Sequence, residues 1–269
     1  MIQIGVNSHA PGPEDLIEDL GIRLVRTEIG DHLSDADLDI ILGRFAVRPS
    51  LTPLLEIRVS KASVVAFLVH AERVLNTTRN HQKGRLGLLE VGNEPDLSSM
   101  GPWADQPALF GHACRAIHET LRALSFDGPI VSGGISTLGT RGLDYLRAME
   151  WDAMPADLIC GVHSYAHHED EIAKLRAIIG DRQIAVTETG KSMKPSGWWC
   201  FKKAPSEEDV GRFLCQEFDY WQAHGALCCC VFLWADGGPG DDDRWGLVAA
   251  DGRVKAQGAA AQQWIERHR

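Results

Sequence analysis

The feature that most constrains the fold is an alternation of short apolar runs with amphipathic helical patterns, repeated eight times along 269 residues. The runs predict strands at 2–7, 22–27, 51–59, 86–92, 129–133, 157–163, 183–188 and 228–234. The amphipathic patterns predict helices at 13–20, 34–43, 60–78, 106–124, 141–150, 168–179, 206–224 and 254–266. Alternating strands and helices give parallel strands joined by right-handed crossovers, so eight units predict one (β/α)8 barrel over 1–269.

An open, doubly wound sheet is the alternative architecture. Such folds commonly carry a phosphate-binding GxGxxG turn after the first strand, and the segment 5–12 lacks that spacing. A one-domain α/β barrel takes roughly 250 residues, which leaves no room here for a second domain. The sequence therefore favours the closed barrel.

The charge balance limits the partners that we expect. A formal net charge of −10 disfavours nucleic acid and anionic membranes, and the longest apolar run, Val64 to Val69, is too short to cross a bilayer. A neutral substrate is easier to accept, and we expect a monomer without cofactors.

The cysteines predict a reducing compartment. The chain has seven, an odd number, without a CxxC spacing, and Cys228, Cys229 and Cys230 are adjacent in an apolar strand where neighbours point to opposite faces. Reduced thiols that fill the core are expected. The first residues lack the features of a secretory signal, which favours a cytoplasmic location.

Chemistry is expected where the strand over 86–92 ends. Leu88 and Leu89 open a buried run that closes on Asn93-Glu94-Pro95. Side chains alternate along a strand, so Glu90, Gly92 and Glu94 are expected to share the face that lines the barrel interior. Glu94 is then a carboxylate at the rim of a pit.

A second glutamate, Glu188, closes the strand over 183–188. Two glutamates at the tops of the fourth and seventh strands can face each other across the barrel mouth. Such a pair suits glycoside hydrolysis, in which one carboxyl group donates a proton to the leaving oxygen while the other attacks the anomeric carbon or activates water.

Together these residues resemble the clan A retaining glycoside hydrolases, especially family 39 and its neighbours. The residues 90–95, Glu-Val-Gly-Asn-Glu-Pro, are similar to the E-x-W-N-E-P motif of that clan. His163-Ser164-Tyr165, Thr187-Glu188, Trp234 and Arg26 are similar to further clan signatures, and they occur in the same order along the chain. Gly92 departs from the tryptophan common in family 39, and the appended β-domain of many members is missing.

The resemblance implies a role for each residue. Glu94 would be the acid/base and Glu188 the nucleophile, with Tyr165 hydrogen-bonded to the nucleophile and Arg26 beneath it. Asn93 would hold the sugar 2-hydroxyl, Trp234 would form the sugar platform, and His163 would be a supporting polar contact. Two of these residues have other readings: Arg26 could form a buried ion pair with Glu56 or Glu90, and His163 could be a core histidine.

Three stretches without a clear pattern follow strands, at 95–105, 190–205 and 235–247, and in a barrel they lie on the active-site face. Trp103, Trp198 and Trp199 occur in them and are expected to stack on sugars, although one of the three could cap a helix. His167-His168-Glu169-Asp170 contains metal-ligand types without HExxH spacing, and the run 237–243 contains aspartates without the spacing of a calcium loop. No metal site is predicted.

The sequence thus predicts a retaining glycoside hydrolase that cleaves a β-linked oligo- or polysaccharide, with its two carboxyl groups about 5–5.5 Å apart. A non-catalytic carbohydrate-binding barrel and a metal-dependent barrel hydrolase are the alternatives.

Overall fold

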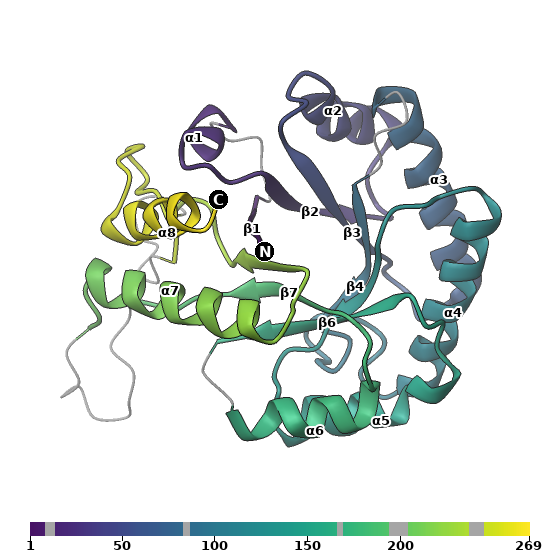
Figure 1. Cartoon of the computed structure of the whole chain (residues 1–269). Coiled ribbons are helices and arrows are strands. Elements are labelled where there is room, and N and C mark those ends of the chain that lie inside the picture. The colour runs from purple at the N-terminus through teal and green to yellow at the C-terminus, as the bar shows by residue number, and fades with distance from the viewer. Residues whose placement is uncertain (9–13, 83–86, 166–168, 194–203, 237–244) are drawn as a thin grey trace.

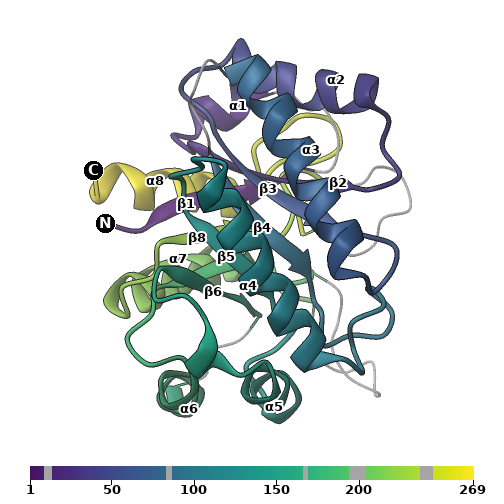
Figure 2. The same cartoon turned by 90° about the vertical axis from the view of Figure 1, so that its right-hand side faces the viewer.

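The computed structural model describes residues 1–8, 14–82, 87–165, 169–193, 204–236 and 245–269. Eight parallel strands close a barrel in chain order, from β1 through β8 and back to β1. The helices lie around the outside of the strands, and the two termini lie near each other (Figures 1 and 2). The (β/α)8 barrel expected from the alternating pattern is confirmed.

The strands are β1 Gln3–Asn7, β2 Leu24–Gly30, β3 Thr52–Arg58, β4 Leu88–Asn93, β5 Ile130–Gly134, β6 Leu158–Ser164, β7 Ile184–Thr189 and β8 Cys228–Val231. Every neighbouring pair is parallel, and the register of β7 is irregular against both β6 and β8. Because all carboxyl ends of parallel strands meet at one rim, the ends of β4, β6 and β7 converge there.

The helices are α1 Glu14–Asp19, α2 Asp35–Ala46, α3 Val64–Gln82, α4 Pro107–Ala123, α5 Thr140–Ala148, α6 Glu169–Ile179, α7 Glu207–Ala223 and α8 Ala256–Arg267. A short 3-10 helix, η1, covers Trp151–Ala153. Ser34 and Ser206 form capping boxes with Asp37 and Asp209, which fixes the starts of α2 and α7. Within the described part of the chain, no helix combines the length and apolarity needed to span a membrane.

Several element boundaries differ from the sequence expectation, and local contacts explain two of them. Helix α3 begins at Val64 rather than at residue 60, because the Ser63 hydroxyl accepts the amide hydrogen of Ala66 and caps the first turn. Strand β8 ends at Val231 rather than at residue 234. The apolar run continues, but the chain bends away from the sheet, and the amide of Trp234 donates instead to the carbonyl of Asn7.

The barrel interior has an apolar base. Eight buried side chains fill it: Leu24, Leu54, Leu88, Val131, Ile159, Ala185, Cys228 and Cys230. Cys229 instead joins the larger core between strands and helices. The alternation expected for the three cysteines is therefore confirmed, and among the described residues all six cysteines are free thiols. Two positions beyond Leu24, Leu54 and Leu88, the same strands place charged residues in the interior.

Candidate active site

Alternation along β4 holds at Glu90 but breaks at Gly92. The expectation that Glu90, Gly92 and Glu94 share the interior face is wrong at Gly92, which has a left-handed φ of 82°. A Cβ on Gly92 would lie 3.2 Å from the Phe110 ring, in the core outside the barrel. Because this glycine reverses the alternation, Asn93 points inward, and its Oδ1 accepts a hydrogen bond of 2.8 Å from Arg26.

Glu94 follows directly and also has a left-handed backbone, with φ 41°. Its amide donates to the carbonyl of Gly134 at 2.9 Å, which holds this conformation against the neighbouring strand. A non-glycine residue with positive φ is strained, and such strain often occurs at functional sites. The side chain is 14% exposed at the barrel rim, as expected from its strand-end position.

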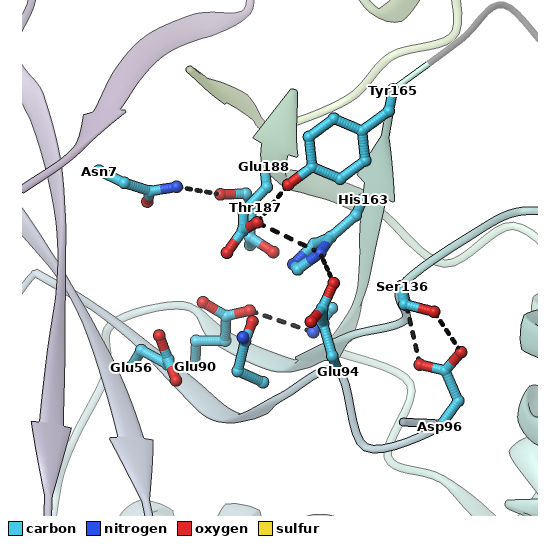
Figure 3. Close-up of polar contacts among 12 residues, drawn as sticks. Asn7, Glu56, Glu90, Glu94, Asp96, Ser136, His163, Tyr165, Thr187 and Glu188 are labelled. Atoms are coloured by element: carbon cyan, nitrogen blue, oxygen red, sulfur yellow. Dashed lines mark hydrogen bonds and ion pairs between the residues drawn. The ribbon is translucent and has the colours of Figure 1, made fainter. Parts of the chain in front are cut away.

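A bulge in β7 brings Glu188 to the same rim. Val162 pairs with Val186, but the next residue of β6, His163, pairs with Glu188, so Thr187 is an extra residue in β7. A bulge of this kind re-aims the side chain that follows it. As a result Glu188 faces the interior beside His163, and the two side chains converge with Glu94 (Figure 3).

Arg26, which is fully buried on β2, connects the acidic side chains of the interior. Its Nε donates to Glu90 at 2.5 Å, Nη2 lies 3.1 Å from Glu56, and Nη1 donates to Glu188 at 2.8 Å. Arg26 therefore fits both interpretations made from the sequence. It lies beneath Glu188, and it also forms buried ion pairs with Glu56 and Glu90.

Glu90 is the deeper carboxylate that burial affects most clearly. Burial raises the pKa of Glu90, and the opposing attraction of Arg26 does not cancel that rise. Glu90 Oε1 also accepts the amide hydrogen of Gly134 at 3.1 Å. Glu56 has a second cation, Arg58, at 2.8 Å. The layer beneath the rim is thus a hydrogen-bonded charge network that fixes the position of Arg26.

His163 links the two rim glutamates. Its Nδ1 lies 3.1 Å from Glu94 Oε1 and 3.5 Å from Glu188 Oε2, and its ring is buried. Burial lowers the pKa of His163, but the Glu188 and Glu94 carboxylates outweigh that effect, so the net pKa is raised. His163 is therefore more than a core histidine, because it bridges both carboxyl groups.

Glu188 is held in its ionised form. Burial would raise the pKa of Glu188, but His163, Arg26 and the Tyr165 hydroxyl outweigh it, and the net pKa is lowered. The hydroxyl of Tyr165 donates to Glu188 Oε2 at 2.5 Å. Burial and the nearby Glu188 charge raise the pKa of Tyr165, which keeps the phenol protonated and able to donate.

One oxygen from Glu94 and one from Glu188, together with a ring nitrogen of His163, lie within 4.8 Å of one another. These are ligand types for a divalent cation. Both oxygens of Glu188 already accept hydrogen bonds, from Arg26 and Tyr165, and His163 occupies Oε1 of Glu94. A cation would have to displace these donors, so the arrangement suits proton transfer and nucleophilic attack better than metal binding.

The four tryptophans that were expected to contact a sugar divide into three groups. Trp103 is 4% exposed and packs on Phe67 and Phe110, with ring centroids 5.7 and 5.4 Å apart, so its expected role as a sugar contact is corrected to core packing. Trp234 is buried at 3%, and its Nε1 has no hydrogen-bond partner among the described residues. Trp198 and Trp199 lie outside the described residues, as do His167, His168 and residues 237–243.

Two residues at this site were not predicted from the sequence. Asn7 is buried at the end of β1, where its Nδ2 donates to the Thr187 carbonyl at 3.4 Å and its Oδ1 lies 3.5 Å from Arg26 (Figure 3). Trp245 packs against Tyr165 with ring centroids 5.7 Å apart. Asn7 ends a predicted strand, so a polar strand-end residue was a usable signal, whereas Trp245 lies in a stretch without a pattern.

No protein-family model matches the sequence, and no curated protein matches it. Solved structures do match the fold. A family 39 β-xylosidase from Caulobacter crescentus has a TM-score of 0.74 at 13% identity over 97% of this chain and 70% of its own. A family 39 enzyme from Xanthomonas axonopodis pv. citri has a TM-score of 0.74 at 14% identity, over 97% of this chain and 65% of its own. A family 5 glycoside hydrolase from Bifidobacterium longum, in complex with Manβ1-4GlcNAc, has a TM-score of 0.73 at 12% identity, over 100% of this chain and 78% of its own.

At these identities the likeness shows the fold alone, and the chain spans 65–70% of the length of the two family 39 enzymes. The resemblance to clan A glycoside hydrolases that the strand-end residues indicate is confirmed at the level of the barrel fold.

Proposed function

We propose that the protein is a retaining glycoside hydrolase with Glu94 as the acid/base and Glu188 as the nucleophile. The observation that carries the proposal is the close approach of the two carboxyl groups, with one oxygen of each within 4.8 Å. Retaining enzymes need carboxyl groups about 5–5.5 Å apart, whereas inverting enzymes leave about 6.5–9.5 Å for a water molecule. The short separation supports direct attack on the sugar.

The unequal surroundings of the two carboxyl groups support the division of roles. Glu188 is 4% exposed, its pKa is lowered, and both of its oxygens accept hydrogen bonds that hold it in a fixed orientation. Glu94 is nearer the solvent, and His163 is the hydrogen-bond partner of its Oε1 among the described residues. We therefore assign the transfer of the proton to the leaving oxygen to Glu94.

In the first step an oxygen of Glu188 forms a bond to the anomeric carbon as the glycosidic bond breaks. The leaving oxygen takes the proton from Glu94, so an alcohol departs and a glycosyl ester remains on Glu188. In the second step Glu94, now ionised, removes a proton from water while the water oxygen attacks the anomeric carbon. Glu188 is released as a carboxylate, and Glu94 regains its proton.

The substrate class that we propose is a β-linked oligo- or polysaccharide. Asn93, which Arg26 holds at the rim, would contact a sugar hydroxyl beside the reacting carbon in this proposal. The net charge of −10 favours a neutral glycan over a polyanion. The solved family 5 relative, in complex with Manβ1-4GlcNAc, is consistent with this class.

The test separates the two glutamates with aryl β-glycosides, after reducing-end release from β-glucans, xylans, mannans and bacterial exopolysaccharides has identified the sugar. Glu188→Ala should lose all turnover, and azide should yield the α-glycosyl azide. Glu94→Ala should still form the covalent intermediate from an activated aryl glycoside, and azide should yield the β-glycosyl azide. On the polymer, Glu94→Ala should lose about 10²–10⁴-fold in kcat.

Glu119, an exposed glutamate on α4, provides the matched control, and Glu119→Ala should keep full activity. Exchange of the two azide anomers between the variants would reverse the assigned roles. Full activity in both variants would place the catalytic site elsewhere, and sugar binding by the wild-type protein without turnover would indicate a carbohydrate-binding barrel.

A further inference from the structure

Tyr165, the residue that hydrogen-bonds Glu188, is enclosed by rings. Trp245 and Phe232 contact it edge-on, with centroid distances of 5.7 and 6.1 Å and interplanar angles of 74° and 77°. His163 contacts it from a third direction at 6.2 Å and 90°. Edge-to-face contacts of this kind restrict the orientation of a ring. The direction in which the Tyr165 hydroxyl points is therefore set by its aromatic neighbours.

Trp245 is itself held close to the end of β7. A Cβ on Gly190 would lie 3.1 Å from the six-membered ring of Trp245, so the ring packs directly on the backbone two residues after Glu188. Phe232, which directly follows β8, also contacts Trp245, and the two ring centroids are 5.3 Å apart. Trp245 is partly exposed, and its position depends on what fixes the backbone at residues 245 and 246.

Gly246, the next residue, is fixed on both of its backbone polar groups. Its amide donates to Asp236 Oδ1 at 2.9 Å, and its carbonyl accepts from Gln257 Nε2 at 2.8 Å. A Cβ at this position would lie 2.4 Å from the backbone of Ala235 and Asp236, so only glycine permits this approach. Gln257 is fully buried at the start of α8.

A buried cation holds Asp236 in turn. Lys255 is 1% exposed, and its Nζ lies 3.0 and 3.1 Å from the two oxygens of Asp236. The amide of Lys255 donates to the carbonyl of Leu247 at 3.0 Å, which ties the start of α8 to the same segment. Removing one partner of a buried ion pair leaves the other charge uncompensated, so this pair strongly constrains the local backbone.

These contacts form a continuous path from α8 to the rim carboxylate. We propose that Lys255, Asp236 and Gln257 are positioning residues for the nucleophile: they hold Gly246, Gly246 fixes Trp245, and Trp245 with Phe232 directs the Tyr165 hydroxyl onto Glu188. The role of Glu188 as nucleophile rests on the function proposed above. The contacts themselves exist whichever reaction the site performs.

The central test removes the cation far from the substrate. Lys255→Met keeps the length of the side chain and removes its charge, and Lys174→Met, at an exposed lysine of α6, is the matched control. In a crystal structure of Lys255→Met we expect Trp245 to leave its position beside Tyr165 and the Tyr165 hydroxyl to separate from Glu188. An unmoved Tyr165 would overturn the proposal, and this readout holds even if the protein cleaves no glycoside.

The kinetic test uses the acid limb of the pH profile of kcat/KM, which reports the ionisation of Glu188. Among the described residues, the charged or titratable groups that face Glu188 are Arg26 from β2, Glu94 after β4, His163 at the end of β6 and Tyr165 directly after β6. Loss of the tyrosine hydrogen bond removes one of the effects that lower the pKa of Glu188, so the acid limb should move to higher pH.

Lys255→Met and Tyr165→Phe should each produce this shift and lower kcat by roughly 10–100-fold, as for the loss of a hydrogen bond to a charged group. The double variant should behave like Tyr165→Phe alone, because both changes break one path. Additive effects, or an unmoved acid limb with a raised KM, would overturn the proposal and make Trp245 a sugar contact.

Trp245→Phe, which retains an aromatic ring, should keep most of the activity that Trp245→Leu loses.

Discussion

The lower and upper layers of the barrel interior come from the same strands but differ completely in chemistry. Leu24, Leu54 and Leu88 fill the base, and two residues further along, Arg26, Glu56 and Glu90 fill the next layer. All are almost entirely buried. The apolar base needs only shape and volume to be stable, whereas the charged layer needs each charge to be paired and hydrogen-bonded.

The comparison indicates what each layer contributes. Apolar packing of the base stabilises the barrel by about 1.5–3 kcal/mol for each fully buried large side chain. The charged layer gains little net stability, because the loss of hydration of its three charges offsets their attraction. Its contribution is to orient Arg26 under Glu188 and Asn93, both at the rim. The base therefore supports the fold, and the upper layer supports the site.

Breaking the charged layer should have the largest effect. Arg26→Met leaves Glu56, Glu90 and Glu188 without their shared cation, so the free energy of unfolding should fall by about 3–5 kcal/mol at pH 7. Carboxylates buried without a cation have raised pKa values, and the stability that their protonated forms retain at low pH is lost as pH rises. Denaturant titrations at pH 4.5 and 7 should therefore show the larger loss at pH 7.

Arg58→Met is the matched control for Arg26, since Arg58 also pairs with Glu56 but is 26% exposed. It should lose no more than about 1 kcal/mol. Equal losses in the two variants, or a loss that is larger at pH 4.5, would show that the charged layer does not depend on Arg26.

Breaking the apolar base should affect stability alone. Leu54→Ala removes a fully buried side chain and should lower the free energy of unfolding by about 2–5 kcal/mol. The kcat of the folded fraction should stay unchanged, because the backbone two residues on still carries Glu56. Ile40→Ala, at a residue 66% exposed on α2, is the control and should have an effect below about 0.5 kcal/mol. A large drop in kcat for Leu54→Ala would mean that the layers are coupled.

The two layers were predictable from sequence to different extents. The repeated strand and helix patterns predicted the barrel, and strand alternation placed Glu90 inside it and separated Cys229 from Cys228 and Cys230. These predictions succeed because every interior position of a barrel strand follows a period of two. The rim follows local backbone geometry instead, and a period of two does not describe it.

Four features at or near the rim show why. The left-handed Gly92 turns Asn93 inward, and the extra Thr187 in β7 turns Glu188 inward, and neither event changes the hydrophobic pattern. Trp103 was expected to face a sugar because it follows β4, yet it packs into the core beneath the loop. Trp245 reaches Tyr165 only through tertiary contacts of Gly246. Each of these depends on contacts between segments distant in sequence.

Gly92→Ala should break the rim without touching either layer. A left-handed alanine costs roughly 1–2 kcal/mol, and its Cβ would press on Phe110 at 3.2 Å, so a total loss of about 1–3 kcal/mol in stability is expected. If the strand relaxes toward ordinary alternation, Asn93 turns away from Arg26, and KM should rise. Gly180→Ala is the control, because Gly180 has a φ of 66° but no neighbour within 4 Å, so only the backbone strain applies. An equal KM in both variants would show that Asn93 keeps its orientation.

The smallest expected effect is a shift in pH dependence at His163→Gln. His163 has a raised pKa, and its charge lowers the pKa of Glu188 together with Arg26 and the Tyr165 hydroxyl. Glutamine can still donate to the glutamates but carries no charge, so the pKa of Glu188 should rise. Ionised Glu188 is required for attack, and the acid limb of kcat/KM should therefore move to higher pH, with kcat at neutral pH reduced far less than in Glu188→Ala. His81→Gln, at a partly exposed histidine paired with Asp39, should leave the limb unmoved. A limb that stays in place in His163→Gln would mean that Arg26 and the Tyr165 hydroxyl, rather than the charge of His163, set the ionisation of Glu188.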